Sequence, residues 1–486
     1  MTEAATTPAP RRRRLARFVI ATLLALVAIV AGLAVQLRIG LGPEVPTPPL
    51  VEVRAAPATL LFRDVSVFTG TSPVARPRSD VVVQGGRVIA VRPTGEPPPA
   101  GAEIVEGAGR TLLPGFIDAH THVIGSGGGP WAPSRTSDAH NLEAYVYSGV
   151  TTTFALAGLA SEFASLEKAM SAGKLIGPRL WYTHTPITAP GGHPLLVGRE
   201  LFPWPMSSIM AAMIPQPATP AAAEAVVADT VSHDVHFVKA IVDSLPPSAP
   251  VMREDVLRAL ADASHRRKKK LFVHIGTIDD ALKAARAGAD VLAHGIYRGP
   301  VKPAEAEEIA RLKVPLIFTL AGWVRTAAIA RGAFAPSALD RATAPASILE
   351  SLQGDAGRIF CMDGAMGEFG AALVDNERFW KDNVRTLHAA GVTMLVGTDS
   401  PLPGVFPGSS YHEEMRLLVE AGIPPGEVLL GATARAADVL GLDVGRVEEG
   451  RPADLVLVKG DPLTSIADAA AVEMVVLRGK VVKRTR

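Results

Sequence analysis

Gly115-Phe116-Ile117-Asp118-Ala119-His120-Thr121-His122 is the stretch of sequence that decides the fold prediction. An apolar run ends here in two histidines. Side chains in a β-strand repeat with a period of two, so His120 and His122 face the same side. Neutral imidazole is a preferred ligand of borderline metals such as zinc. Two surface histidines at a strand end would show the same spacing, so the metal prediction depends on the rest of the chain.

The composition describes a globular chain of near-neutral charge. Of its 486 residues, 48% are hydrophobic and 20% are charged, and the formal net charge is +1. These values exclude a disordered chain and give no electrostatic reason to expect a nucleic-acid partner. The single cysteine, Cys361, excludes an internal disulfide and a cysteine-based zinc cluster. The length suits one large domain with a smaller one attached.

The N-terminus carries the features of a membrane or export signal. Residues 1–17 form a basic tail, and residues 18–37 hold an apolar run long enough to span a bilayer. The basic flank predicts that the tail stays in the cytoplasm and that the rest of the chain lies outside. An uncleaved transmembrane anchor and a signal peptide cut near Gly32-Leu33-Ala34 both fit this pattern. A Pro-rich linker follows at residues 38–57.

Short Val-rich runs at both ends of the chain predict one small β-sandwich. They occupy residues 58–112 and return in residues 441–486. Between them, residues 113–440 alternate apolar runs with helical stretches, which is the pattern of βα units and a parallel sheet. Eight such runs predict a (β/α)8 TIM barrel: 116–122, 150–155, 179–184, 236–242, 271–274, 291–294, 315–320 and 394–399.

Polar side chains at the ends of these predicted strands indicate the site. Barrel enzymes place their catalytic groups at the carboxyl ends of the strands. His122 ends the first run and Lys239 lies within the fourth. His274, His294 and Asp399 end the fifth, sixth and eighth runs. Histidines that converge with a carboxylate in this way predict a metal centre.

On these residues the chain resembles the amidohydrolase superfamily, metal-dependent hydrolases with a (β/α)8 barrel. The resemblance covers nearly the whole chain after the linker. Its motifs are 114–122, 237–239, 273–274, 293–295, 397–399, 431–434 and 445–456. A Gly-Gly-His loop, here Gly191-Gly192-His193, is similar to that of the subgroup that includes imidazolonepropionase-like enzymes and Xaa-Pro dipeptidases.

The resemblance implies two divalent metal ions, expected to be Zn²⁺, and a carboxylated lysine that bridges them. The implied ligands are His120, His122, Lys239, His274, His294 and Asp399. A lysine in an apolar strand is desolvated, which lowers its pKa and favours the neutral amine that adds carbon dioxide. A lysine that reaches toward solvent at the barrel rim is the alternative.

The expected reaction is hydrolysis of a peptide-like or cyclic amide C–N bond. A hydroxide that bridges the metals would attack the carbonyl, with Asp399 as general acid and base. His193 is expected to donate a hydrogen bond to the carbonyl of a small-molecule or short-peptide substrate. Tyr297 and Arg298 are expected to bind a substrate oxygen or carboxylate, since an arginine suits a carboxylate. The alternatives are a lactone or ester hydrolase and a non-catalytic, membrane-tethered metal-binding protein. Assembly into a homo-oligomer is left open.

Overall fold

The computed structural model describes residues 42–202 and 204–485, together with the separate residues 19, 20, 22, 23, 30 and 32. Most of the predicted membrane segment, residues 18–37, therefore lies outside the described residues. Within the part of the chain that is described, no helix is long and apolar enough to cross a membrane. The anchor or signal segment stays a prediction.

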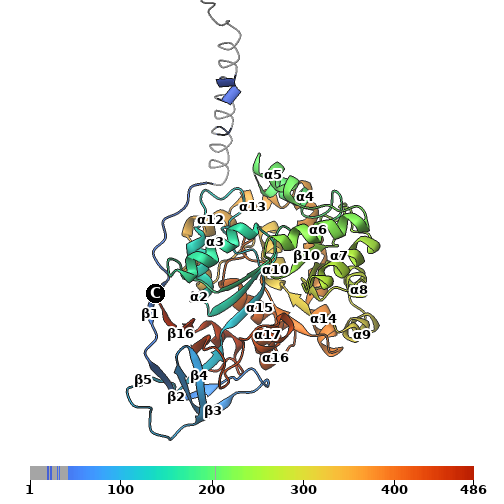
Figure 1. The fold of residues 1–486 in the computed structure, drawn as a ribbon. Coiled ribbons are helices and arrows are strands. Elements are labelled where there is room, and N and C mark those ends of the chain that lie inside the picture. Colours follow the sequence, from blue (N-terminus) through green and yellow to red (C-terminus); the bar gives the residue numbers. More distant parts are fainter. Residues whose placement is uncertain are drawn as a thin grey trace, which may run out of the picture.

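Eight parallel strands form a barrel (Figure 1). One sheet holds β7, β8 and β9, and a second holds β10 to β14. Parallel bridges from Thr121 to Ser400 and from Ile187 to Ala240 join the two sheets at both seams. Each of the eight predicted runs contains one of these strands. Their bounds are β7 Phe116–Thr121, β8 Val150–Ala155, β9 Arg179–Tyr182, β10 Val238–Ile241, β11 Leu271–His274, β12 Val291–Ala293, β13 Leu316–Phe318 and β14 Met394–Val396.

Helices return the chain from one barrel strand to the next. The helix between β11 and β12 starts at a capping box, in which the Thr277 hydroxyl and the Asp280 carboxylate each accept from the other's backbone N–H. Gly288 follows its end with a φ of +100°, which glycine adopts without strain. The helices that cover the barrel are α2 Asp138–Tyr147, α3 Ala160–Ser171, α6 Pro220–Ser232, α7 Glu254–Arg266, α8 Ile278–Arg286, α9 Pro303–Leu312, α14 Gly364–Ala389, α15 Ser409–Glu420, α16 Pro425–Gly431 and α17 Ala434–Leu440.

Further helices lie in the loops that leave the carboxyl ends of two strands. Two follow β9: α4 Leu195–Leu201 and α5 Met206–Met213. Four follow β13: α10 Leu320–Ala330, α11 Ala338–Thr343, α12 Ala346–Gln353 and α13 Asp355–Phe360. In Figure 1, α4, α5, α12 and α13 lie at the end of the molecule opposite β2, β3 and β5. These helices therefore surround the end of the barrel that carries the candidate site.

Both chain ends build the small β-sandwich. Its strand order is β1-β17-β16-β15-β6-β2-β3-β4, with β5 beside β2. The bounds are β1 Val51–Ala55, β2 Thr59–Val67, β3 Arg76–Gln84, β4 Arg87–Pro93, β5 Glu103–Glu106, β6 Arg110–Pro114, β15 Leu455–Lys459, β16 Val472–Leu477 and β17 Lys480–Arg484, and the 3-10 helix η1 is Ile466–Ala470. The sheet begins at β1, inside the predicted linker, because β1 pairs with β17 from the other end of the chain.

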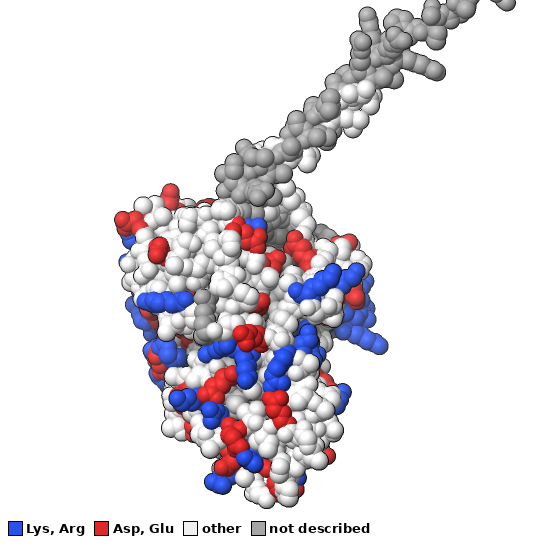
Figure 2. Space-filling model, turned by 90° about the vertical axis from the view of Figure 1, so that its left-hand side faces the viewer, with Lys and Arg blue, Asp and Glu red and all other residues white. Residues whose placement is uncertain are grey.

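Charged side chains are dispersed on the face shown in Figure 2. Acidic and basic groups are interspersed there, most densely over the lower part of the molecule. This face therefore presents no broad area of one sign.

Alternation along the strands decides which side chains enter the barrel. Phe237 and Phe272 pack against Phe154 in the interior, with 4.5 Å between the centroids of the first two rings. With a period of two, Lys239 follows Phe237 into the barrel and His274 follows Phe272. The aromatic layer therefore forms the floor beneath the candidate site.

Candidate metal centre

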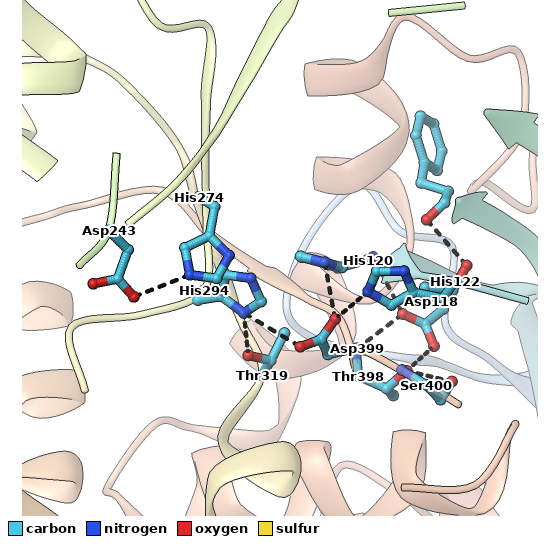
Figure 3. A network of polar contacts seen from close by, with 12 residues as sticks. Asp118, His120, His122, Asp243, His274, His294, Thr319, Thr398, Asp399 and Ser400 are labelled. Atoms are coloured by element: carbon cyan, nitrogen blue, oxygen red, sulfur yellow. Dashed lines mark hydrogen bonds and ion pairs between the residues drawn. The ribbon is translucent and has the colours of Figure 1, made fainter. Parts of the chain in front are cut away.

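The two histidines at the end of β7 converge with Asp399. The Nε2 atoms of His120 and His122 lie 3.1 and 2.8 Å from Asp399 Oδ1. One ligand atom from each of the three residues lies within 4.8 Å of the others, and Figure 3 shows both rings beside this carboxylate. Two imidazole nitrogens and a carboxylate oxygen are ligands that suit zinc. This triad could hold one divalent ion.

Electrostatics keep Asp399 and His120 in the protonation states that bind a cation. Burial opposes the ionisation of Asp399, but the charges and hydrogen bonds of the neighbouring histidines outweigh it and hold its pKa well below the ordinary value. Burial and then the nearby Lys239 lower the pKa of His120 to about 3. Metal ligands must be a neutral imidazole and an ionised carboxylate, so neither group needs to lose a proton at neutral pH.

His274 and His294 extend the site beyond the triad. The ring centroid of His294 lies 4.4 Å from that of His120 and 4.1 Å from that of His274. His294 Nδ1 lies 2.9 Å from the Thr319 hydroxyl, which leaves Nε2 free for a ligand. All three histidines are buried. The structure therefore brings five of the six predicted ligands into one cluster. The sixth, Lys239, reaches this cluster from β10.

Two of these candidate ligands have an unusual backbone conformation. The φ angle is +68° at His294 and +66° at Asp399, and such residues cost about 1–3 kcal/mol each. Val291 and Ala293 face the barrel interior, so regular alternation would direct His294 outward. The left-handed conformation instead brings the His294 imidazole into the site. The strained backbone at His294 is therefore explained by the position of its side chain.

Lys239 has a buried amine without a hydrogen-bond partner. Its side chain is only 3% exposed, and Nζ has no partner among the described residues. Burial lowers the pKa of Lys239 to about 7. Unpaired buried polar atoms are uncommon and call for an explanation. A carbamate on this nitrogen would carry two oxygen ligands, so the donor set fits a pair of ions bridged at Lys239.

Asp118 and Gly397 hold the first and last strands of the barrel together beside the ligands. The Thr398 N–H donates to Asp118 Oδ1 at 3.1 Å, and the Thr398 hydroxyl donates to Oδ2 at 2.7 Å. Burial raises the pKa of Asp118 to about 8, although these hydrogen bonds oppose the shift. A Cβ atom at Gly397 would lie 2.9 Å from His120 Cβ. Only glycine permits this approach of β14 to β7.

Asp243 is a site residue that the sequence did not single out. It follows β10 and lies next to His274, whose Nε2 is 3.0 Å from Asp243 Oδ2. The Tyr297 hydroxyl donates to the same oxygen, and the Arg298 guanidinium donates to Oδ1. Burial opposes ionisation of Asp243, but the bond and charge of His274, the charge of Arg298 and the Tyr297 bond lower its pKa to about 2. The carboxylate therefore fixes Nε2 of His274 and leaves Nδ1 for a metal.

The predicted substrate contacts Tyr297 and Arg298 both bind Asp243. Tyr297 is 2% exposed, and Arg298 lies mainly against Asp243 and Ser244. A substrate carboxylate that reached Arg298 would meet a guanidinium whose charge is already matched. The structure thus places these side chains behind His274, and their contact with a substrate stays a prediction.

Asp243→Asn is expected to reduce metal affinity by about 10–100-fold, the usual effect of losing the partner of a ligating histidine. The amide cannot match the Arg298 charge, so the protein should also lose stability, on the order of 3–5 kcal/mol for a broken buried ion pair. Metal titration and thermal unfolding measure both effects. Asp290→Asn is the matched control because Asp290 makes a 2.8 Å contact to His265 outside the site. Equal metal affinity in the two variants would contradict the role of Asp243.

His193 reaches the site from the loop after β9. Its ring centroid is 5.0 Å from that of His274, and its Nδ1 donates to the Leu245 carbonyl at 3.0 Å. Burial and then the charge of His274 lower its pKa to about 3. With its one proton on Nδ1, the neutral ring presents Nε2 as a hydrogen-bond acceptor. This tautomer would accept from a substrate N–H rather than donate to a carbonyl.

The chain matches a protein-family model and several curated proteins. The model described as "Amidohydrolase family" matches residues 111–482. The imidazolonepropionase of Streptomyces griseus subsp. griseus is 25% identical over 434 residues, which cover 86% of this chain and 95% of that protein. The chain therefore aligns with almost the full length of this relative.

Solved structures share the fold. A prolidase complexed with N-methylphosphonate-L-proline matches with a TM-score of 0.67 and 21% identity, over 88% of this chain and 100% of that one. A Xaa-Pro dipeptidase with methionine bound in its active site matches with a TM-score of 0.68 and 20% identity, over 87% of this chain and 100% of that one. At such identities the likeness concerns the fold alone.

Proposed function

The chain belongs to the amidohydrolase family, and from this premise we propose that it hydrolyses a peptide-like or cyclic amide C–N bond with two divalent ions. Membership confirms the resemblance recognised in the sequence and makes the chain a hydrolase of this family. We expect Zn²⁺, given the imidazole and carboxylate donors. The ligands in the proposal are His120, His122, Lys239, His274, His294 and Asp399.

The observation that carries the proposal is the unpaired amine of Lys239. The triad of His120, His122 and Asp399 can hold one ion without it. A second ion beside His274 and His294 would gain a further ligand from a group on Lys239, whose charge acts on both His120 and His294. A carbamate at Nζ would supply that ligand and would give this buried nitrogen a role.

Asp399 moves the proton in the proposed reaction. When bound, the ions would supply a nucleophilic hydroxide near neutral pH and polarise the scissile carbonyl. Asp399 Oδ1 faces the Nε2 atoms of His120 and His122, whereas Oδ2 lies 3.8 Å from Nδ1 of His294. Oδ2 can therefore take the proton of the attacking water and pass it to the leaving nitrogen.

The substrate class is supported by His193 and by the relatives. Nε2 of His193 would accept a hydrogen bond from a substrate N–H beside the scissile bond. The named substrates of the relatives, imidazolone propionate and Xaa-Pro dipeptides, are the first compounds to assay. A lactone or ester hydrolase would use the same carbonyl chemistry and is the second candidate.

Metal analysis and a substrate panel test the proposal together. The protein should hold two equivalents of metal and turn over at least one amide among N-acyl amino acids, Xaa-Pro dipeptides and imidazolone propionate. Turnover of lactones alone would move the assignment to an ester hydrolase. Two equivalents of metal without turnover on the whole panel would favour a metal-binding protein that lacks catalysis.

We further propose that residues 18–37 anchor the protein and that the barrel lies outside the cytoplasm. The support is the apolar run itself and the arginines before it. A cleaved signal peptide is the alternative. The protein is expressed in a host that exports proteins, and the N-terminus of the mature protein is determined by mass spectrometry. An intact N-terminus indicates the anchor, and a cleaved one indicates the signal peptide.

A further inference from the structure

A helical hairpin whose second half carries no charge projects from the edge of the candidate site. It begins directly after His193, whose ring contacts His274, and contains α4 and α5. It returns at Pro215, whose carbonyl accepts from the Thr188 N–H at 3.0 Å. No charged residue occurs from Leu201 to Thr219. The hairpin therefore presents an apolar surface beside the mouth of the barrel.

Large apolar side chains are exposed on this hairpin and on the loop that packs beside it. In α5 no residue is buried, and Trp204 and Ile209 are 62% and 50% exposed. Ile359 and Met362, at the end of α13, are similarly exposed. Such clusters on a soluble domain indicate an interaction surface. We call Trp204, Ile209, Met213, Ile359 and Met362 the apolar rim.

One carboxylate ties the two parts of the apolar rim together. Glu200 at the end of α4 accepts hydrogen bonds from the Ala365 and Met366 N–H groups at 2.7 and 2.9 Å. These N–H groups lie in the first turn of α14, three and four residues after Met362. In Figure 1, α4, α5 and α13 lie at the same end of the molecule. The rim is thus one surface formed by two loops.

The N-terminal chain reaches the folded body at this same end. The Val45 N–H donates to the Arg135 carbonyl at 2.9 Å, and the Arg135 N–H donates to the Pro43 carbonyl at 3.0 Å. Arg135 belongs to the loop after β7, where the Trp131 and Phe360 ring centroids are 4.8 Å apart. Phe360 ends α13, so the entry point of the chain adjoins the apolar rim.

The short connection to the predicted anchor limits how far this end can lie from a membrane. The apolar run of the sequence ends at residue 37, and Pro43 is fixed to the body. A chain extends at most about 3.6 Å per residue, so these few residues reach roughly 20 Å. The site-bearing end of the barrel, rather than the small domain, would therefore face the bilayer.

We propose that the apolar rim rests on the outer surface of the lipid bilayer that holds the N-terminal anchor. Its tryptophan and aliphatic side chains enter the headgroup boundary, as the apolar faces of interfacial helices do. The absence of charge from Leu201 to Thr219 spares the hairpin part of the rim the desolvation cost that charged side chains would add. The mouth of the barrel then opens beside the membrane surface.

Native tryptophan fluorescence tests the proposal on the full chain. All five tryptophans lie outside the predicted anchor, and Trp204 is on the rim. The protein is reconstituted into phosphatidylcholine–phosphatidylglycerol vesicles, with or without brominated acyl chains. Quenching should remove up to about one-fifth of the emission, the share of one tryptophan in five, and Trp204→Phe should abolish most of this loss.

Two further variants, each with one tryptophan added to the Trp204→Phe background, provide a matched pair. Ile209→Trp, on the rim, should restore quenching, whereas Val74→Trp, 62% exposed on the small domain, should not. Unquenched wild-type protein that floats with the vesicles would overturn the rim proposal, and a blue shift without quenching would indicate a second copy of the chain instead. Failure to float would overturn the anchor and the rim together.

Discussion

Replacing Lys239 by methionine is expected to remove one of two bound metal equivalents and to lower kcat by about 10²–10³-fold, the scale of losing one group that stabilises developing charge. Methionine fills a similar volume and has no amine that could add carbon dioxide. The remaining triad of His120, His122 and Asp399 should still hold one ion. Metal content measured by mass spectrometry, together with turnover on the best amide of the panel, provides the test.

The pH dependence of metal loading gives an independent reading of the same residue. Carbamate formation joins the Nζ lone pair to carbon dioxide and releases a proton, so it requires the neutral amine. With a pKa of about 7, roughly 90% of Lys239 is neutral at pH 8, against less than about 1% of an ordinary lysine. Loading in bicarbonate buffer should therefore rise between pH 6 and pH 8 in the wild type, while Lys239→Met should lack this rise.

The Lys239→Met variant should be less active than the wild type but, in the metal-free state, more stable. The pKa of Lys239 is lowered in the folded chain, so the unfolded chain binds the additional proton between pH 7 and pH 10.5. The free energy of unfolding then rises with pH across that window. Lys239→Met removes this cost and should stabilise the metal-free protein by about 2–4 kcal/mol at pH 7.

Lys269→Met is the control for both measurements, because the Lys269 amine donates to the Val235 carbonyl at 2.6 Å, outside the site. It should leave metal content and turnover unchanged. Two metal equivalents in Lys239→Met would remove the bridging lysine from the proposal. A metal-free Lys239→Met variant that is less stable than the wild type would show that the amine has a partner and that its burial does not lower the free energy of unfolding.

The positions of the barrel strands and of most candidate ligands were predictable because they depend on local alternation. Apolar runs of the right length marked all eight strands, and each one contains a strand in the structure. A period of two places Lys239 of β10 above Phe237, which directly precedes that strand, and places His274 above Phe272 in β11. Spacing along one strand was enough to orient these side chains.

Other features could not be predicted, since they arise from contacts between distant segments. Nothing in Val242-Asp243-Ser244 marks a site residue, and the role of Asp243 appears only when Tyr297 and Arg298 fold back onto it. The ring of His294 enters the site through a left-handed φ that strand alternation does not foresee. Similarly, β1 exists because β17 offers it an edge. In each case the partner, rather than the residue's own neighbours, decides the structure.

Asp399→Asn separates the chemistry of the site from its assembly. Asparagine keeps the shape of the side chain and an oxygen ligand, so most of the metal should remain bound. It cannot take a proton at neutral pH, and kcat for an amide should fall by about 10²–10⁴-fold, the contribution of general acid–base catalysis. Metal content and kcat, measured on the same preparation, decide whether the loss is catalytic.

The leaving group distinguishes the proton-transfer role of Asp399 from a role in placing the metal. An amine must be protonated as it leaves, whereas p-nitrophenolate leaves without a proton. Asp399→Asn should therefore lose much less activity on a p-nitrophenyl ester of the preferred acyl group than on the amide. Equal losses on both compounds would assign Asp399 to metal positioning alone, and near-wild-type amide turnover with full metal would exclude it as the acid and base. The His120 and His122 nitrogens both contact Oδ1 of Asp399. Oδ2 is therefore the oxygen that we expect to carry the proton to the leaving group.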